Sequence, residues 1–202
     1  MNNTSEFQPP VANEMQIQRN KLLSRYDSSR GNLLIVMLFS LINLIILAVG
    51  GNSYFLFSAS VPYAIGDMAM YLCGKYPQEF YTAEELSAGE FLNNTVFVIM
   101  LAAAFICIAF YFLCWLMSKK HGVGWLIAAL AAFVLDTLFM FWWYVSFADI
   151  VLDIVIHIWV LVSLIMGIIA YFKLKKIPVE EAAAVEEPVA QTVLNGGEDN
   201  EL

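Results

Sequence analysis

The stretch that decides the fold is VGWLIAALAAFVLDTLFMFWWYVSF, which covers residues 123–147 of this 202-residue chain. It contains a single charged side chain, Asp136, which lies 13 residues after Val123. A helix needs about 20 mainly apolar residues to cross the hydrocarbon core of a bilayer. The stretch is therefore predicted to be a transmembrane helix with a carboxyl group near its middle.

Three more apolar runs of similar length lie at residues 32–50, 93–117 and 152–172. A helix satisfies its own backbone hydrogen bonds in lipid, whereas the alternating ten-residue segments of a membrane barrel are missing. Hydrophobic residues make up 60% of the chain and charged residues 14%. These proportions are unlike those of a soluble domain. The sequence therefore predicts an all-α membrane protein with four transmembrane helices.

The positions of the basic residues predict the orientation. Nine of the ten Lys and Arg residues lie before the first run, between the second and third, or after the fourth: Arg19, Lys21, Arg25, Arg30, Lys119, Lys120, Lys173, Lys175 and Lys176. Lys75 is the exception. Because cytoplasmic segments carry the excess of basic residues, both termini are predicted to be cytoplasmic in a multi-pass protein of the inner (plasma) membrane.

Two cytoplasmic segments flank the transmembrane domain, which is expected to cover residues 32–172. Residues 1–31 form the first, with an amphipathic helix at Val11–Tyr26 that lies on anionic lipid or binds a partner protein. Residues 173–202 form the second, a short basic stop and then an acidic tail that is predicted to be disordered. The two hypotheses for Val11–Tyr26 stay open.

Residues 51–92 form the one large outer segment, whose apolar beginning indicates contact with the membrane. Pro62 suits the first turn of a short interfacial helix after Ser60. That helix either packs on the outer ends of the bundle or covers a ligand site. Thr82 and Glu85 form a capping-box pattern, which predicts the start of another helix. Gly89 is the weak point for its continuation into the second span.

Five polar residues are candidates for a site inside the membrane: Asn43, Asp136, Asp149, Asp153 and His157. Asp149, Asp153 and His157 are spaced by four residues and share one helical face. A short loop joins the third and fourth spans, so Asp136 and His157 are expected to approach each other. Asn43 reaches a similar depth in the first span.

Three hypotheses for these residues stay open. They form interhelical hydrogen bonds, or they form a proton or cation path. The third hypothesis is a divalent metal site of two carboxylates and one imidazole, although no dedicated metal motif is present. The sequence contains no catalytic motif and no cofactor motif, so an enzyme is not expected. The net charge of −8 argues against nucleic-acid binding.

The residues from Asn32 through the run GNSYFLFSASVPY (residues 51–63) to Pro77 resemble uncharacterised small bacterial four-helix integral membrane proteins. The resemblance implies the architecture and a bacterial inner membrane, and it carries no catalytic residue. In span number and outer loop the chain is also similar to claudin-like and tetraspanin-like proteins, without their paired loop cysteines. Small multidrug transporters resemble it in span number, although the first span here lacks an acid.

Two functions follow as hypotheses. The first is a non-enzymatic accessory or interaction protein, which binds a protein partner through its cytoplasmic ends. The alternative is a small transporter or proton-coupled permease that uses the Asp136 and His157 pair. The lipid bilayer is an expected partner of both, and a homo-oligomer is compatible with both.

Overall fold

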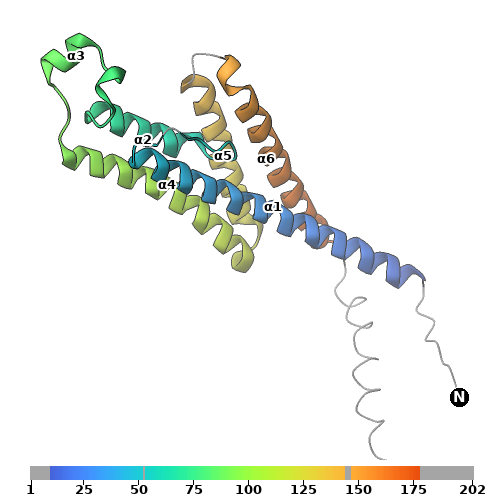
Figure 1. The fold of residues 1–202 in the computed structure, drawn as a ribbon. Helices are drawn as coiled ribbons and strands as arrows, with labels where there is room; N and C mark the ends of the chain where they lie inside the picture. The colour runs from blue at the N-terminus through green and yellow to red at the C-terminus, as the bar shows by residue number, and fades with distance from the viewer. Residues whose placement is uncertain (1–9, 52, 144–146, 178–202) are drawn as a thin grey trace, which may run out of the picture.

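The computed structural model describes residues 10–51, 53–143 and 147–177, and within these ranges the regular structure is entirely helical. Figure 1 shows the helices in chain order. Their bounds are α1 Pro10–Ala48, α2 Ser60–Leu72, α3 Ala83–Ala88, α4 Asn94–His121, α5 Val123–Trp143 and α6 Phe147–Leu174, with a 3-10 turn, η1, at Gln78–Phe80. The predicted all-α fold is confirmed for this part of the chain.

Four of the described helices are long and apolar enough to cross a membrane. The qualifying segments are Glu14–Ala48, Asn94–Lys119, Val123–Trp143 and Val151–Leu174. Their outward faces are strongly apolar, since Val98 on α4 is 62% exposed and Leu138 on α5 is 60% exposed. Apolar exposure on this scale is compatible with helices that contact lipid rather than water.

The helix bounds differ from the predicted spans in several places. The third predicted span was too long, since α5 is Val123–Trp143 and Phe147 belongs to α6, and α4 continues to His121. α1 begins at Pro10 and continues without a break to Ala48, so the predicted N-terminal helix and the first span are one helix. Gly31 does not interrupt it, because a single helical glycine costs only about 1 kcal/mol. α6 begins at Phe147, five residues before the predicted start. The predicted disordered tail lies almost entirely outside the described residues.

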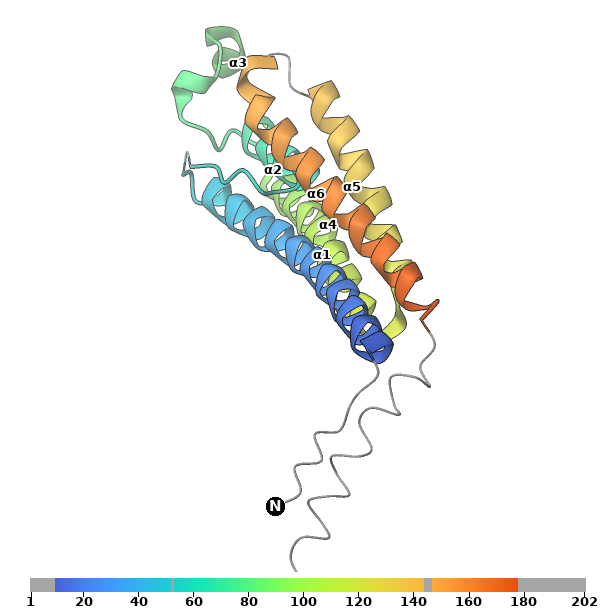
Figure 2. The ribbon, with the colours of Figure 1, turned by 90° about the vertical axis from the view of Figure 1, so that its right-hand side faces the viewer.

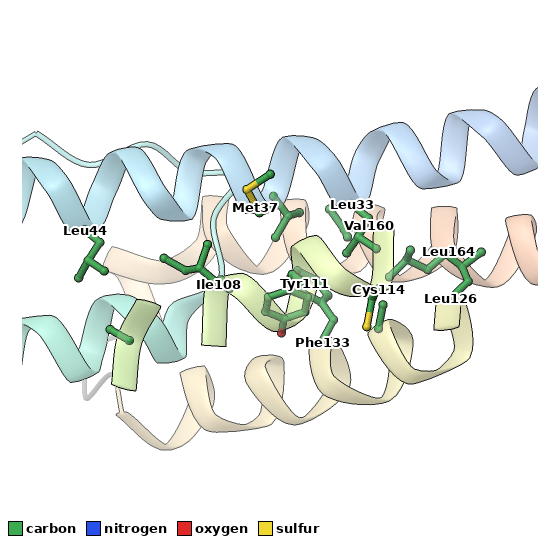
Figure 3. Packing of buried hydrophobic residues seen from close by; sticks show 14 residues of the cluster. Leu33, Met37, Leu44, Ile108, Tyr111, Cys114, Leu126, Phe133, Val160 and Leu164 are labelled. Carbon is green, nitrogen blue, oxygen red and sulfur yellow. The ribbon is translucent and has the colours of Figure 1, made fainter. Parts of the chain in front are cut away.

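The four long helices run side by side in Figure 2, and α2 lies among them. α2 packs against α1, α4 and α5. The core joins the long helices through Met37 of α1, Tyr111 of α4, Phe133 of α5 and Val160 of α6, all nearly fully buried (Figure 3).

α3 lies at one end of this bundle, which we call the acidic end. The start of α1 and the end of α6 lie at the other, the basic end.

The predicted capping box at the start of α3 is confirmed. The Thr82 hydroxyl accepts a hydrogen bond from the backbone N–H of Glu85, and the Glu85 carboxylate accepts one from the N–H of Thr82. The helix ends at Gly89, whose φ of +62° lies in the left-handed region that glycine adopts readily. α3 therefore does not continue into α4, which begins separately after its own cap, Asn93.

Gly167 allows α1 and α6 to pack closely, and this contact gives a testable prediction. A Cβ atom at Gly167 would lie 2.4 Å from the Cβ of Ser29, whereas one at Gly31 would meet nothing within 4 Å. We expect Gly167→Ala to lower the free energy of unfolding by about 1–3 kcal/mol because of overpacking. We expect Gly31→Ala to raise it by about 0.4–1 kcal/mol.

Reversible unfolding of the two variants in mixed micelles measures this difference. Both variants add the same methyl group to a helix of the same bundle, so they form a matched pair. Equal effects of the two substitutions would contradict the close α1–α6 contact.

Candidate functional site: the buried first turn of α2

The segment between α1 and α2 runs back alongside α1. Asn43, which is fully buried, donates hydrogen bonds from Nδ2 to the Phe55 carbonyl oxygen at 2.7 Å and to Ser58 Oγ at 2.8 Å. Its Oδ1 accepts a bond from the Phe55 N–H at 2.8 Å. One asparagine therefore satisfies both backbone polar groups of Phe55.

Ser40 continues this role one turn earlier in α1. Its Oγ accepts a hydrogen bond from the Ala59 N–H at 2.7 Å and donates one to the Val36 carbonyl oxygen at 2.8 Å. Ser40 and Asn43 are three residues apart and therefore share a helical face. Through these hydrogen bonds, this face of α1 holds the chain from Phe55 to Ala59, the residue before α2.

Asp136 of α5 caps the N-terminus of α2. Its Oδ2 accepts a hydrogen bond from the Ser60 N–H at 2.9 Å, and its Oδ1 accepts one from the Val61 N–H at 2.8 Å. The first N–H groups of a helix have no partner inside the helix and carry its positive dipole end. Ala59, at the N-cap position, has no side-chain oxygen to offer. The carboxylate of another helix takes over this function.

The cap lies deep within the bundle. Asp136 is 2% exposed and lies about 20 Å along α5 from Val123, at 1.5 Å per residue. α2 therefore begins beside the second half of α5, about 10 Å before the end of that helix at Trp143. From this point it extends toward the acidic end (Figure 2).

His157 of α6 completes the site. Its Nε2 lies 3.3 Å from Asp136 Oδ2 and 3.5 Å from Ser60 Oγ, and its Nδ1 lies 2.8 Å from the carbonyl oxygen of Asp153. A carbonyl oxygen only accepts, so Nδ1 carries a hydrogen. The ring stacks on Phe133 with centroids 4.9 Å apart. A hydrogen on Nε2 or on Oδ2 completes the contact between the imidazole and the carboxyl group.

The remaining predicted site residues are Asp153, Asp149 and Asn43, and each has a different place in the structure. Asp153 contacts His157 through its backbone carbonyl, and among the described residues its buried Oδ1 has no hydrogen-bond partner. Asp149 lies in α6, but its side chain is outside the described part of the chain. Asn43 binds the segment before α2 rather than the Asp136 and His157 pair.

Sequence reasoning missed three serines of this site. Ser40, Ser58 and Ser60 are each at most 3% exposed, and all three make hydrogen bonds there. The signal was present in the run Ser58-Ala-Ser-Val-Pro62, where small polar residues precede a proline within an apolar segment. Within the described residues no three His, Cys, Asp or Glu side chains gather around one point, so the metal hypothesis gains no support there.

A cavity of about 580 Å³ reaches Asp136 from between α2, α4 and α5. Its walls are apolar except for a few groups, and they include Pro62 of α2, Tyr111 of α4 and Leu135 of α5. The volume lies within the range of small-molecule sites in proteins. A ligand in this cavity would lie next to the carboxylate that holds α2.

Arg30 is a buried polar residue outside the site around Asp136. From the sequence alone it is only one of the basic residues that predict the orientation. It is 8% exposed, and its Nε donates to Ser118 Oγ at 2.9 Å. Tyr26 donates from its hydroxyl to the Ser118 carbonyl oxygen at 2.8 Å. These contacts join α1 to the end of α4 at the basic end of the bundle.

The chain matches no protein-family model, no curated protein and no solved structure. The resemblance to small bacterial membrane proteins therefore stays a prediction. The contacts among Asp136, His157 and α2 are the features that point to a function of this chain.

Proposed function

We propose that this chain is a multi-pass membrane protein with both termini in the cytoplasm and with α2 as a re-entrant helix. The positive-inside rule supports the orientation, since α1 and α6 carry exposed basic side chains at the same end of the bundle. The buried cap supports the re-entrant path, because non-helical backbone is tolerated at membrane depth only where protein groups satisfy it. In this arrangement α2 reaches the membrane interior from the outside.

We propose further that the protein is a small proton-coupled permease. The observation that carries this proposal is the Asp136–His157 pair at the N-terminus of α2, next to a cavity of about 580 Å³. Short helices that end near the membrane midplane often point their termini at substrate or ion sites in transporters. Ionisable groups buried at this depth are costly and commonly mark such paths.

Proton binding can control how firmly α2 is attached. Both Asp136 oxygens accept backbone N–H groups, so a negative carboxylate suits the cap and the helix dipole. The other titratable side chains near the pair are Cys107 and Tyr111, which line the cavity, and Asp153. None of these supplies a positive charge. Only a proton that binds the Asp136 carboxylate itself removes the charge that holds the first turn of α2, and loss of this charge favours a state in which α2 is released.

Electrogenic transport in proteoliposomes tests this proposal. Purified protein is adsorbed on a solid-supported membrane, and a panel of small organic cations, anions and neutral solutes is applied with and without a pH gradient. We expect at least one solute to give a current in the wild type that depends on the gradient. We expect His157→Gln to lose this dependence, because glutamine can donate to Asp136 but does not titrate.

Silence of the wild type with every solute would contradict the permease. Gradient-dependent currents of equal size in His157→Gln would contradict the role of the pair. Empty liposomes prepared in parallel give the leak current of the lipid itself.

An accessory protein that binds partners at its cytoplasmic ends is the second candidate. The observation in its favour is an apolar and basic surface on the first half of α1, where Ile17 is 61% exposed and Leu23 is 39% exposed. Lys21 and Arg25 are exposed beside them. Such a surface suits anionic lipid or a partner helix.

A further inference from the structure

A second cavity, of about 510 Å³, lies at the acidic end of the bundle. Five aromatic side chains and one carboxylate line it: Tyr63, Tyr71, Tyr76, Phe80, Trp143 and Asp67. Tyr63, Asp67 and Tyr71 belong to α2, whereas Tyr76 and Phe80 come from the chain that follows it. The stacked rings of Tyr76 and Phe80, with centroids 5.1 Å apart, are part of the cavity wall.

The negative charge of Asp67 is unmatched. Among the described residues, ion pairs join Arg30 to Asp27 and His157 to Asp136, and Asp67 takes part in none. Lys75 is the single basic residue of the outer segment, and its ammonium group donates to Asn94 Oδ1 at 2.7 Å instead. A carboxylate that lines a cavity without a cationic partner favours a positively charged ligand.

Tyr76 holds Asp67 in place at the cavity. Its hydroxyl donates a hydrogen bond to Asp67 Oδ1 at 2.5 Å. Burial, and then this hydrogen bond, raise the pKa of the Tyr76 phenol well above its usual value, so the phenol keeps its proton. The carboxylate is therefore fixed by a neutral donor, which does not neutralise its charge.

Aromatic faces and a carboxylate are the groups that recognise an organic cation. The face of an aromatic ring attracts a cation through its quadrupole, and quaternary ammonium groups are bound in this way by aromatic cages. A metal ion would need several charged or imidazole ligands, and among the described residues no three His, Cys, Asp or Glu side chains gather. The volume suits a small organic molecule rather than a bare ion.

We propose that this cavity binds an organic cation with a quaternary or methylated ammonium group, with Asp67 as the counter-charge and the aromatic rings as the cage. The site goes beyond the proposed permease, because binding here requires no transport. It shares α2 with the cap, since Ser60 and Asp67 are separated by about 10 Å along one helix. The trimethylammonium group can come from a free solute or from a lipid headgroup.

Calorimetric titration of the protein in nanodiscs tests the proposal. The nanodisc lipids are phosphatidylethanolamine and phosphatidylglycerol, which contain no choline. The probes are choline, its uncharged isostere 3,3-dimethyl-1-butanol, and soluble dibutyrylphosphatidylcholine. We expect saturable binding of choline or of the short lipid, and binding of choline that is at least about tenfold tighter than that of the isostere. Whichever of choline and the short lipid binds more tightly identifies the source of the trimethylammonium group.

Three variants make the test specific. We expect Asp67→Asn, which can still accept from Tyr76, to weaken choline binding at least about tenfold. Phe80→Leu, which removes one ring, should weaken it about three- to tenfold. Glu84→Gln is the matched control, because this exposed residue of α3 does not line the cavity. It should change binding less than about twofold.

Equal binding of choline and its isostere, without tighter binding of the short lipid, would overturn the proposal. The lack of saturable binding of both choline and the short lipid would also overturn it. An equal loss in Asp67→Asn and Glu84→Gln would also overturn it, because the effect would then arise from the general charge of the outer segment. Choline binding without any transport current would support this site and contradict the permease. Transport of other solutes, without binding of choline or of the short lipid, would support the permease and contradict this site.

Discussion

The Asp136→Asn variant is expected to unfold more easily than the wild type, by about 2–4 kcal/mol. In the structure the N–H groups of Ser60 and Val61 each bind one oxygen of Asp136. Asparagine has a single acceptor oxygen, so it can bind only one of these two groups. Its NH₂ group would face the other N–H, and two donors cannot form a hydrogen bond. It also loses the attraction between a negative charge and the N-terminus of α2. Reversible unfolding in mixed micelles, followed by circular dichroism, measures the change.

Asp153→Asn is the matched control, because it makes the same chemical change in another buried carboxyl group of the bundle. Asp153 is 6% exposed, and its Oδ1 has no hydrogen-bond partner among the described residues. We therefore expect a change of no more than about 1 kcal/mol. If both variants were equally destabilised, loss of charge alone would explain the effect, and the cap would not be the cause.

Removing the Asn43 side chain is expected to loosen the segment before α2. In Asn43→Leu the Phe55 N–H and carbonyl groups lose their partner, and Ser58 loses a donor. Each buried backbone group left without a bond costs about 1–3 kcal/mol. We expect amide hydrogen exchange across residues 54–61 to become about 10- to 100-fold faster, as measured by mass spectrometry in nanodiscs.

Asn32→Leu provides the comparison for this experiment. Asn32 lies in the same helix, and its side chain donates to Ser163 Oγ of α6 at 2.5 Å rather than to the segment before α2. The substitution therefore removes a half-buried amide without touching residues 54–61. Unchanged exchange of this segment in Asn43→Leu, or equal acceleration in both variants, would show that Asn43 does not hold it.

Much of the helical architecture could be predicted because it depends on local properties of the sequence. The length of an apolar run determines whether a helix can span, so α4, α5 and α6 were expected close to their observed positions. The approach of Asp136 and His157 was expected because few residues separate the third and fourth apolar runs, so that the two helices are neighbours in sequence and can pack against each other. Both arguments need only nearby residues and the rise of a helix.

The path of the chain before α2 could not be predicted, because its partners are distant in sequence. The Ser60 N–H binds a carboxylate 76 residues later, and nothing in the serine-rich run indicates which helix supplies it. The same is true of Arg30, whose partner Ser118 lies 88 residues away. Periodicity identifies a buried face, but it does not say which polar group of another helix will lie opposite.

The separation between Ser60 and Asp136 also sets an order of events during biosynthesis. At about 5–20 residues per second, the ribosome needs about 4–15 s after adding Ser60 to add the residue that caps it. His157 follows later still. During this interval the first turn of α2 has to bind water, the insertion machinery or another chain. α5 must therefore be in place before the first turn of α2 can reach its final partner.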